Sequence, residues 1–194
     1  DLPDLDRLDD EDDDPIGDKA NLLMGLFESI LSEVTDAQIG IIDRVTGLTY
    51  ERYLTDDFTP TLKEWHQVLK EQPEPEAQDL ALAVETYTTG SQDIFAHNTN
   101  VDLNHRFVIF NLKKLSHKLK PFALMVIQDY IWKQIVENQG KCTTWVYYDE
   151  MQILFKNKAQ ADFFTTLYSR IRKYGAIPTG ITQNVETLAA VEEG

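Results

Sequence analysis

The 194-residue sequence predicts an α/β fold, in which a parallel sheet follows an all-helical segment. Three observations support this prediction. Apolar residues recur at helical spacing through residues 18–89, three short β-prone runs follow them, and two helical patterns separate those runs. The order strand, helix, strand, helix, strand is typical of a parallel sheet whose strands are joined by helical crossovers.

Residues 1–17 form an acidic segment with two prolines, which we expect to be a loop or disordered. Apolar residues are too few there to offset the entropy lost on ordering. Acids recur at alternate positions from Asp10 to Asp14, as in a calcium loop. An EF-hand requires Gly at the sixth position and Glu at the twelfth, however, and the chain has Pro15 and Asn21 there. We therefore expect no calcium site.

Residues 18–97 are predicted to be a helical-bundle subdomain of about four helices. The first helix carries one apolar stripe, formed by Leu22, Leu23, Leu26, Phe27, Ile30 and Leu31. Thr35 with Gln38 has the spacing of a capping box, and so does Thr61 with Glu64, so each pair predicts a helix start. A fourth helical pattern follows two prolines and stops at a glycine, which are typical residues for helix ends.

Residues 98–194 are predicted to be the α/β subdomain. The β-prone runs are residues 106–112, 143–149 and 176–183, and the helical patterns are residues 121–138 and 158–174. Pro178 and Gly180 weaken the third strand. Gly175 is a suitable C-terminal residue for the second helix.

Composition excludes several classes of protein. The net charge is −15, and clustered Lys and Arg are missing, so general nucleic-acid binding is not indicated. Cys142 is the only cysteine, which excludes an internal disulfide, and the histidines have no ligand spacing with it, so no zinc site is expected. The longest apolar run, Phe122–Ile127, is far shorter than the ~18 residues of a membrane span. Trp65, Trp132 and Trp145 are expected in the core rather than as stacking platforms for bases.

Polar residues at predicted strand ends indicate a candidate site. Asp149 and Glu150 follow one strand, Gln183 ends the next and Asn111 ends the first. Ligands of open parallel sheets bind at the carboxyl ends of the strands. Asp149 alone could instead cap a helix that begins at Met151. A cap needs one carboxylate, whereas many NTPases use two adjacent ones, for the water shell of magnesium and for the attacking water.

One expected part of a nucleotide site is missing from the sequence. A phosphate-binding P-loop reads Gly, four residues, then Gly-Lys-Ser or Gly-Lys-Thr, and no stretch of these residues matches it. "GSQDIFAH", residues 90–97, starts with Gly but has neither a second Gly nor a Lys. Without that loop, no part of this sequence would cradle β- and γ-phosphates.

The α/β half resembles the conjugation and type IV secretion motor ATPases, relatives of the HerA and FtsK DNA motors. The similar segments are "NTNVDLNHRFVIFNLKKL", "LKPFALMVIQDYIWKQIV", "TTWVYYDEMQILF" and "LYSRIRKYGAIPTGITQNVETLAA". The acidic start and the helical "QPEPEAQDLALAVETYTTGS" are similar too, so the resemblance covers nearly the entire chain. It implies a RecA-like P-loop NTPase sheet portion with a Walker B strand and an all-helical insertion.

The resemblance also implies residue roles, with ATP and Mg²⁺ as cofactors. Asp149 would be the Walker B carboxylate for magnesium, Glu150 the general base that orients water, and Gln183 a polar sensor that reaches the γ-phosphate. Arg170 and Arg172 match a basic pair that offers charge to a neighbouring subunit's nucleotide. The alternative is that these arginines only complement the dipole of a helix C-terminus.

By resemblance, the chain is part of a cytoplasmic ATPase that powers conjugative transfer or type IV secretion. The full-length protein would be a homo-hexamer, bound to other secretion components at the inner face of the cytoplasmic membrane without a span of its own, and would move protein or DNA cargo. In the family the phosphate loop lies upstream of Asp1 and further strands lie downstream of Gly194, and Asn111 stands where an acid is expected. We therefore expect the 194 residues alone to be inactive. The alternatives are a non-catalytic protein-interaction module and a DNA-translocase or helicase relative.

Overall fold

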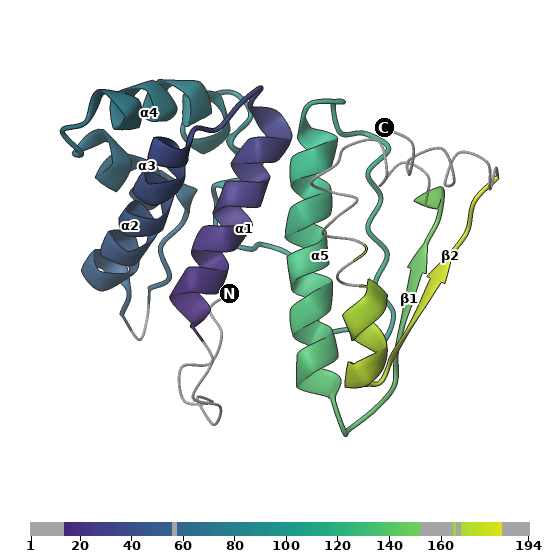
Figure 1. Ribbon diagram of the computed structural model, residues 1–194. Coiled ribbons are helices and arrows are strands. Elements are labelled where there is room, and N and C mark those ends of the chain that lie inside the picture. The colour runs from purple at the N-terminus through teal and green to yellow at the C-terminus, as the bar shows by residue number, and fades with distance from the viewer. Residues whose placement is uncertain (1–13, 56–57, 152–164, 166–167, 184–194) are drawn as a thin grey trace. The chain divides into compact units, whose positions relative to one another are not determined.

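The computed structural model describes residues 14–55, 58–151, 165 and 168–183 (Figure 1). The chain divides into two compact units, with the boundary between Leu119 and Lys120. We describe each unit by itself. The predicted boundary between the helical and α/β subdomains, after residue 97, lies earlier in the chain.

The described part of the first unit contains four α-helices, as the periodicity of the sequence predicts. They are α1 (Pro15–Ile30), α2 (Asp36–Tyr53), α3 (Leu62–Lys70) and α4 (Pro75–Thr88), followed by the short 3-10 helix η2 (Asp93–Phe95). The acidic segment was expected to extend to residue 17, but α1 begins at Pro15. The reason is a cap, because the Asp14 side chain accepts a hydrogen bond of 2.9 Å from the N–H of Gly17.

Both predicted capping boxes are present. The N–H of Gln38 donates to the Thr35 hydroxyl (3.3 Å), and the N–H of Thr35 donates to the Gln38 side chain (3.1 Å). At α3 the N–H of Thr61 donates to the Glu64 carboxylate (2.7 Å). These contacts satisfy amides that have no partner inside a helix, which is why α2 and α3 start where they do.

The core of the first unit is built from apolar residues of all four α-helices. Its buried members are Phe27, Ile41, Ile42, Val45, Trp65, Val68, Leu69, Ala77, Leu80, Ala81 and Val84. The Trp65 ring lies 5.0 Å from that of Phe27, and its N–H donates to the Thr46 hydroxyl at 3.1 Å. His66 is also buried, and its Nε2 lies 3.0 Å from the carbonyl oxygen of Ala81. Trp65 is thus a core residue, as predicted.

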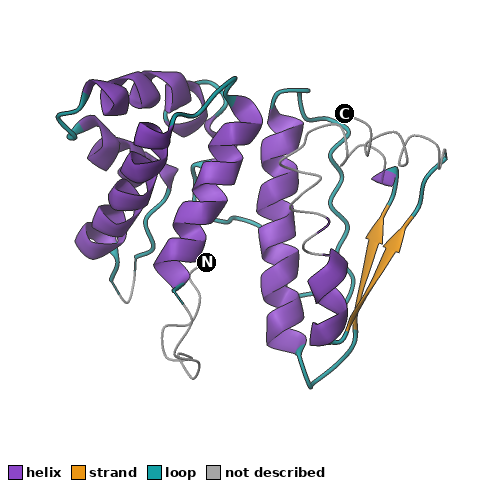
Figure 2. Ribbon diagram, in the orientation of Figure 1, coloured by secondary structure: helices purple, strands orange, loops and turns teal. Residues whose placement is uncertain are grey.

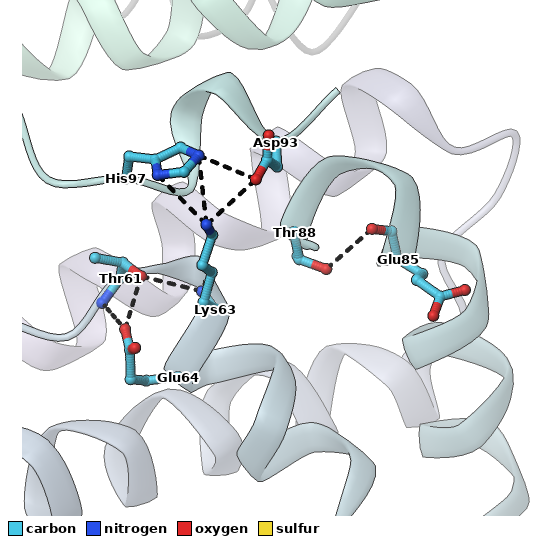
Figure 3. A network of polar contacts seen from close by, with 7 residues as sticks. All are labelled: Thr61, Lys63, Glu64, Glu85, Thr88, Asp93 and His97. Atoms are coloured by element: carbon cyan, nitrogen blue, oxygen red, sulfur yellow. Dashed lines mark hydrogen bonds and ion pairs between the residues drawn. The ribbon is translucent and has the colours of Figure 1, made fainter. Parts of the chain in front are cut away.

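A polar network ties the start of α3 to η2 (Figure 3). The Lys63 ammonium lies 3.3 Å from the Asp93 carboxylate and 3.3 Å from Nδ1 of His97. Nε2 of His97 lies 3.0 Å from the same carboxylate. Lys63 holds the pKa of the Asp93 carboxyl below its ordinary value, although burial acts in the opposite direction. The network therefore joins the start of α3 to the segment that follows α4.

The predicted strand at residues 106–112 is wrong. The structure has neither helix nor strand from Ala96 to Lys118. Phe107 and Ile109 are 75% and 74% exposed, and none of the described strands pairs with this run, although its residues have strand propensity. Asn111 consequently does not end a strand, and its side chain instead accepts a hydrogen bond of 3.0 Å from the N–H of Lys113 in a local turn.

The second unit contains a parallel pair of strands, as predicted (Figure 2). Its described elements include α5 (Leu119–Asn138), β1 (Thr144–Tyr148), the 3-10 helix η4 (Arg172–Tyr174) and β2 (Ala176–Gly180). The register pairs Thr144 with Ala176 and Tyr148 with Gly180. β2 contains Pro178, which an edge strand tolerates. Most of the predicted helix 158–174 lies outside the described residues, but it ends at Gly175, whose φ of 75° is left-handed, as expected for a helix terminus.

One face of this sheet packs against helices (Figure 1). The buried contacts there join Ile135 of α5, Val146 of β1, Ile171 before η4 and Ala176 of β2. The Trp132 ring lies edge-on to that of Tyr174 at 4.8 Å, in agreement with its predicted place in the core. The other face is different, because Trp145 is 58% exposed. The expectation of a core position for Trp145 is therefore wrong.

Candidate active site

The two adjacent carboxylates lie on a turn directly after β1. The N–H of Ile181 donates to the carbonyl of Tyr148 (2.8 Å), and the N–H of Met151 donates to the carbonyl of Ile181 (2.9 Å). The chain thus leaves the ladder at Asp149 and Glu150 and rejoins it at Met151. Both acidic residues are exposed as a result.

The backbone of this turn is strained. Glu150 has a φ of 51°, the only positive φ of a residue other than glycine in the described part of the chain. The Asp149 side chain accepts a hydrogen bond of 3.0 Å from the N–H of Glu150. Left-handed backbone costs a residue with a Cβ about 1 to 2 kcal/mol, and such residues cluster at functional sites. A helix cap by Asp149 would involve residues after Met151, which lie outside the described residues.

Gly180 allows β2 to pass close to this turn. A Cβ at position 180 would collide with the sulfur of Met151, the residue at which the turn rejoins the ladder. From the sequence alone, Gly180 is expected only to weaken the strand. The structure indicates that it makes room for the turn, a role that its sequence neighbours do not reveal.

Gln183 lies at the same end of the strands as the two carboxylates. It follows Gly180 by three residues and is exposed. Because β1 and β2 are parallel and Tyr148 is paired with Gly180, the chain after each strand emerges at one edge of the sheet. The register therefore brings Asp149, Glu150 and Gln183 to a common edge.

The two predicted arginines lie at the opposite end. Arg170 and Arg172 precede β2, whose five residues run from Ala176 to Gly180. A strand of that length spans roughly 16 Å. Both arginines are exposed. The fold thus separates them from the carboxylates of their own chain.

Tyr148 is the last residue of β1 and directly precedes the turn. Its side chain packs against the buried cluster on the helix-covered face, which consists of Ile135, Val146, Ile171 and Ala176. Burial raises the pKa of the Tyr148 phenol well above its ordinary value. This phenol stays protonated at neutral pH, so it is a structural group rather than a base. Alternation along β1 could have indicated its inward position.

Two carboxylates and an amide suit a magnesium ion that is bound mainly through water and phosphate. Mg²⁺ typically keeps several waters and takes one or two protein carboxylates, in addition to substrate phosphates. No group of three or more His, Cys, Asp or Glu residues in the described part of the chain could hold a metal by itself. Asp149 and Glu150 could supply the one or two protein carboxylates of such a site.

None of the helices among the described residues is both long and apolar enough to cross a bilayer. Cys142 is exposed and forms no disulfide.

Comparison with known proteins identifies a similar fold. No protein-family model matches the sequence. No curated protein matches it either. Among solved structures, VirB4 of Thermoanaerobacter pseudethanolicus is similar, with a TM-score of 0.74 and 21% sequence identity. The match covers 92% of this chain and 53% of that one, so this chain spans about half the length of its structural neighbour. The chain thus has the fold of part of VirB4.

Proposed function

We propose that this chain is part of an ATPase that powers type IV secretion or conjugative transfer. The supporting observation is the parallel register, because it brings the carboxylates of residues 149 and 150 and the amide of residue 183 to one edge of the sheet. The likeness to the fold of VirB4, a type IV secretion ATPase, agrees with the sequence resemblance.

Each of the three residues has a distinct task in this proposal. Asp149 orients the water shell of Mg²⁺, and Glu150 accepts the proton of the attacking water. Gln183 donates a hydrogen bond toward the γ-phosphate. When bound, the metal neutralises charge on the phosphates. The RecA-like portion, with its Walker B strand, would be completed by a phosphate loop outside these 194 residues.

Arg170 and Arg172 act on a neighbouring subunit in this proposal. Their distance from the carboxylates along β2 leaves them no role at the nucleotide of their own chain. In a homo-hexamer they would instead stabilise charge on the phosphates held by the next subunit, an effect worth ~10³ to 10⁵ in rate. The assembly would work in the cytoplasm, peripheral to the membrane through partner components, on protein or DNA cargo.

ATP turnover tests this proposal. We expect the 194-residue chain alone to hydrolyse no ATP. A longer natural chain with an upstream Gly-Lys-Ser or Gly-Lys-Thr loop should show Mg²⁺-dependent turnover, and Glu150→Gln should lower it by 10² or more, as expected for loss of a general base. Glu137→Gln, an exposed change on α5, is the matched control and should have no effect.

Three outcomes would change the assignment. Turnover by the 194 residues alone, abolished by Glu150→Gln, would contradict the expected inactivity. A natural chain without any phosphate loop would favour the non-catalytic interaction module. Turnover stimulated by DNA would instead favour the DNA-translocase or helicase relative.

A further inference from the structure

Ile181 is hydrogen-bonded through its backbone to both sides of the acidic turn, which consists of Asp149 and Glu150. Its N–H donates to the carbonyl of Tyr148 at 2.8 Å, and its carbonyl accepts from the N–H of Met151 at 2.9 Å. Tyr148 directly precedes the turn, and Met151 directly follows it. A single residue after β2 therefore holds both ends of the turn.

The spacing of these two hydrogen bonds identifies the turn as a β-bulge. In a regular parallel ladder, the two partners of one residue lie two positions apart on the neighbouring strand. Tyr148 and Met151 lie three positions apart, so Asp149 and Glu150 together oppose Ile181. Two residues opposite one define a bulge. Bulges are rare in parallel pairs, but they are frequent next to active sites, where they redirect a side chain.

The bulge removes a conflict between strand geometry and the proposed roles of the two carboxylates. Successive side chains of a regular strand point to opposite faces of the sheet, so adjacent carboxylates would point away from each other. The extra residue interrupts this alternation. The left-handed backbone of Glu150, with a φ of 51°, occurs at this interruption. The strain of the turn is therefore connected to the direction of the second carboxylate.

A further hydrogen bond belongs to the same bulge. In a regular ladder the N–H of Glu150 would donate to the carbonyl of Ile181, but the N–H of Met151 occupies that acceptor. The N–H of Glu150 instead donates to the Asp149 side chain at 3.0 Å. The Asp149 carboxylate thus replaces the ladder carbonyl as the partner of this amide, and the two acidic residues hold each other.

The same residue is connected to the predicted sensor. Gln183 follows Ile181 by two residues and lies at the same edge of the sheet as the acidic turn. The Ile181 side chain is 50% exposed, so its backbone hydrogen bonds are its main connection to β1. A displacement of the segment from Ile181 to Gln183 therefore moves a donor and an acceptor that hold the two ends of the turn.

We propose that Ile181 is a positioning residue, which couples Gln183 to Glu150 through the bulge. Contact of the Gln183 amide with the γ-phosphate moves this segment, and the two backbone hydrogen bonds of Ile181 move the acidic turn with it. Glu150 is then aimed at the attacking water when nucleotide is bound. A misplacement of about 1 Å can lower a rate about 100-fold. The coupling rests on the proposed ATPase function, whereas the bulge does not.

Amide hydrogen exchange in the 194-residue chain, followed by NMR, tests the bulge. The amides of Met151 and Ile181 should be protected. Asp149→Ala should accelerate exchange at the Glu150 amide about tenfold or more, as expected for loss of a hydrogen bond to a charged group, and should leave the other two amides unchanged. A protected Glu150 amide in this variant, with an unprotected Met151 amide, would show a regular ladder and overturn the proposal.

Hydrogen-exchange mass spectrometry on a longer chain with the phosphate loop tests the coupling. An ATP analogue that is not hydrolysed, added with Mg²⁺, should slow exchange at Met151 and Ile181 together. Gln183→Ala should abolish this slowing while the analogue still binds. Slowing that is equal with and without the Gln183 amide would refute the coupling.

Turnover by the longer chain tests the positioning of Glu150. Met151→Pro removes the N–H that donates to Ile181 and disfavours left-handed backbone at the preceding residue. It should lower kcat about tenfold or more, with KM for ATP unchanged. Combined with Glu150→Gln it should cause little further loss, because no base is left to misplace. A defect that is only structural would lower kcat equally in both backgrounds.

A matched proline control and a check of folding accompany this variant. Val101→Pro changes a residue that is 59% exposed and belongs to neither helix nor strand, so it should leave kcat unchanged. Circular dichroism checks that Met151→Pro is folded. If it is unfolded, the effect of Gln183→Ala on exchange decides the coupling.

Failure of the coupling and failure of the proposed function give different results. A longer chain that neither binds the analogue nor hydrolyses ATP would contradict the function and the coupling together, while exchange in the 194-residue chain still decides the bulge. A longer chain whose turnover is lost in Glu150→Gln, but whose nucleotide-dependent protection persists in Gln183→Ala, would support the function and refute the coupling.

Discussion

The N–H of Ile181 donates a hydrogen bond of 2.8 Å to the carbonyl oxygen of Tyr148, and this contact extends the parallel ladder to the base of the acidic turn. The next hydrogen bond, from Met151 to Ile181, closes the turn on its other side. Asp149 and Glu150 are thus anchored at both flanks, although their side chains are exposed. A preorganised site requires that the backbone that carries its polar groups is rigid.

Replacement of Glu150 by glycine should stabilise the second unit. Glycine adopts a φ of 51° without the cost that a Cβ imposes, so we expect the free energy of unfolding to rise by about 1 kcal/mol. Urea denaturation measures this change. Glu137→Gly within α5 is the control and should lower stability by about 1 kcal/mol. A loss of stability in Glu150→Gly would show that the carboxylate, and not the backbone, holds the turn.

Replacement of Gly180 by alanine should destabilise the turn. The new methyl group would collide with the Met151 sulfur, which lies near the end of a flexible side chain and can move, so we expect a cost at the lower end of the about 1 to 3 kcal/mol that overpacking causes. Met151→Ala removes the obstacle, so the double variant should recover most of the loss. A double-mutant cycle with urea denaturation measures the coupling. Additive effects would mean that Met151 is not what Gly180 avoids.

His66 should make the first unit less stable in weak acid. Burial lowers the pKa of its imidazole below the ordinary value of 6.5, so the unfolded chain takes up a proton more readily than the folded one. Stability is therefore fully present above about pH 6.5 and falls as pH decreases below it, with a slope of at most about 1.4 kcal/mol per pH unit. Denaturation between pH 5 and 8 measures this slope.

A matched variant isolates the contribution of His66. His66→Gln keeps a donor for the Ala81 carbonyl but does not titrate, so its stability should vary less between pH 5 and 6.5. His105→Gln serves as the control, because His105 is an exposed residue of the same unit. Equal slopes in the original chain and in His66→Gln would refute the assignment.

Thr61→Ala should weaken α3. The change removes the hydroxyl contact with Lys63 N–H (3.2 Å) and the contact of the same hydroxyl with the Glu64 carboxylate (2.7 Å). Loss of an N-cap costs about 1 kcal/mol. Thermal unfolding should show the decrease, and Thr61→Ser should retain most of the stability. Lys63 also contacts Asp93 and His97 (Figure 3), so we expect the contacts among these three side chains to weaken as well.

Local signals explain which parts of the fold the sequence could predict. The helices of the first unit were foreseeable because their apolar spacing and the pairs Thr35 with Gln38 and Thr61 with Glu64 act within a few residues. The same holds for β1 and β2, whose β-prone runs are bounded by turn residues. Their parallel pairing followed from the intervening helical pattern.

Tertiary contacts explain the rest. Residues 106–112 have strand propensity, but a strand also needs a partner, and propensity says nothing about whether one is present. Trp145 looks like a core residue by composition, although the packing of α5 decides which face of β1 is covered. The left-handed backbone of Glu150 and the contact of Gly180 with Met151 depend on the meeting of two strands that are distant in sequence. The sequence was sufficient to predict that Asp149, Glu150 and Gln183 share one edge of the sheet. It was not sufficient to predict the backbone conformation and the close contact that hold the turn there.

The pairing of β1 with β2 also has a kinetic consequence. The four helices of the first unit mostly touch their sequence neighbours, whereas the sheet joins residues 144–148 to residues 176–180. Rates of folding fall as the average sequence separation of native contacts grows. The helical bundle should accordingly assemble first, and the sheet, with its acidic turn, should be the slower step in the maturation of the chain.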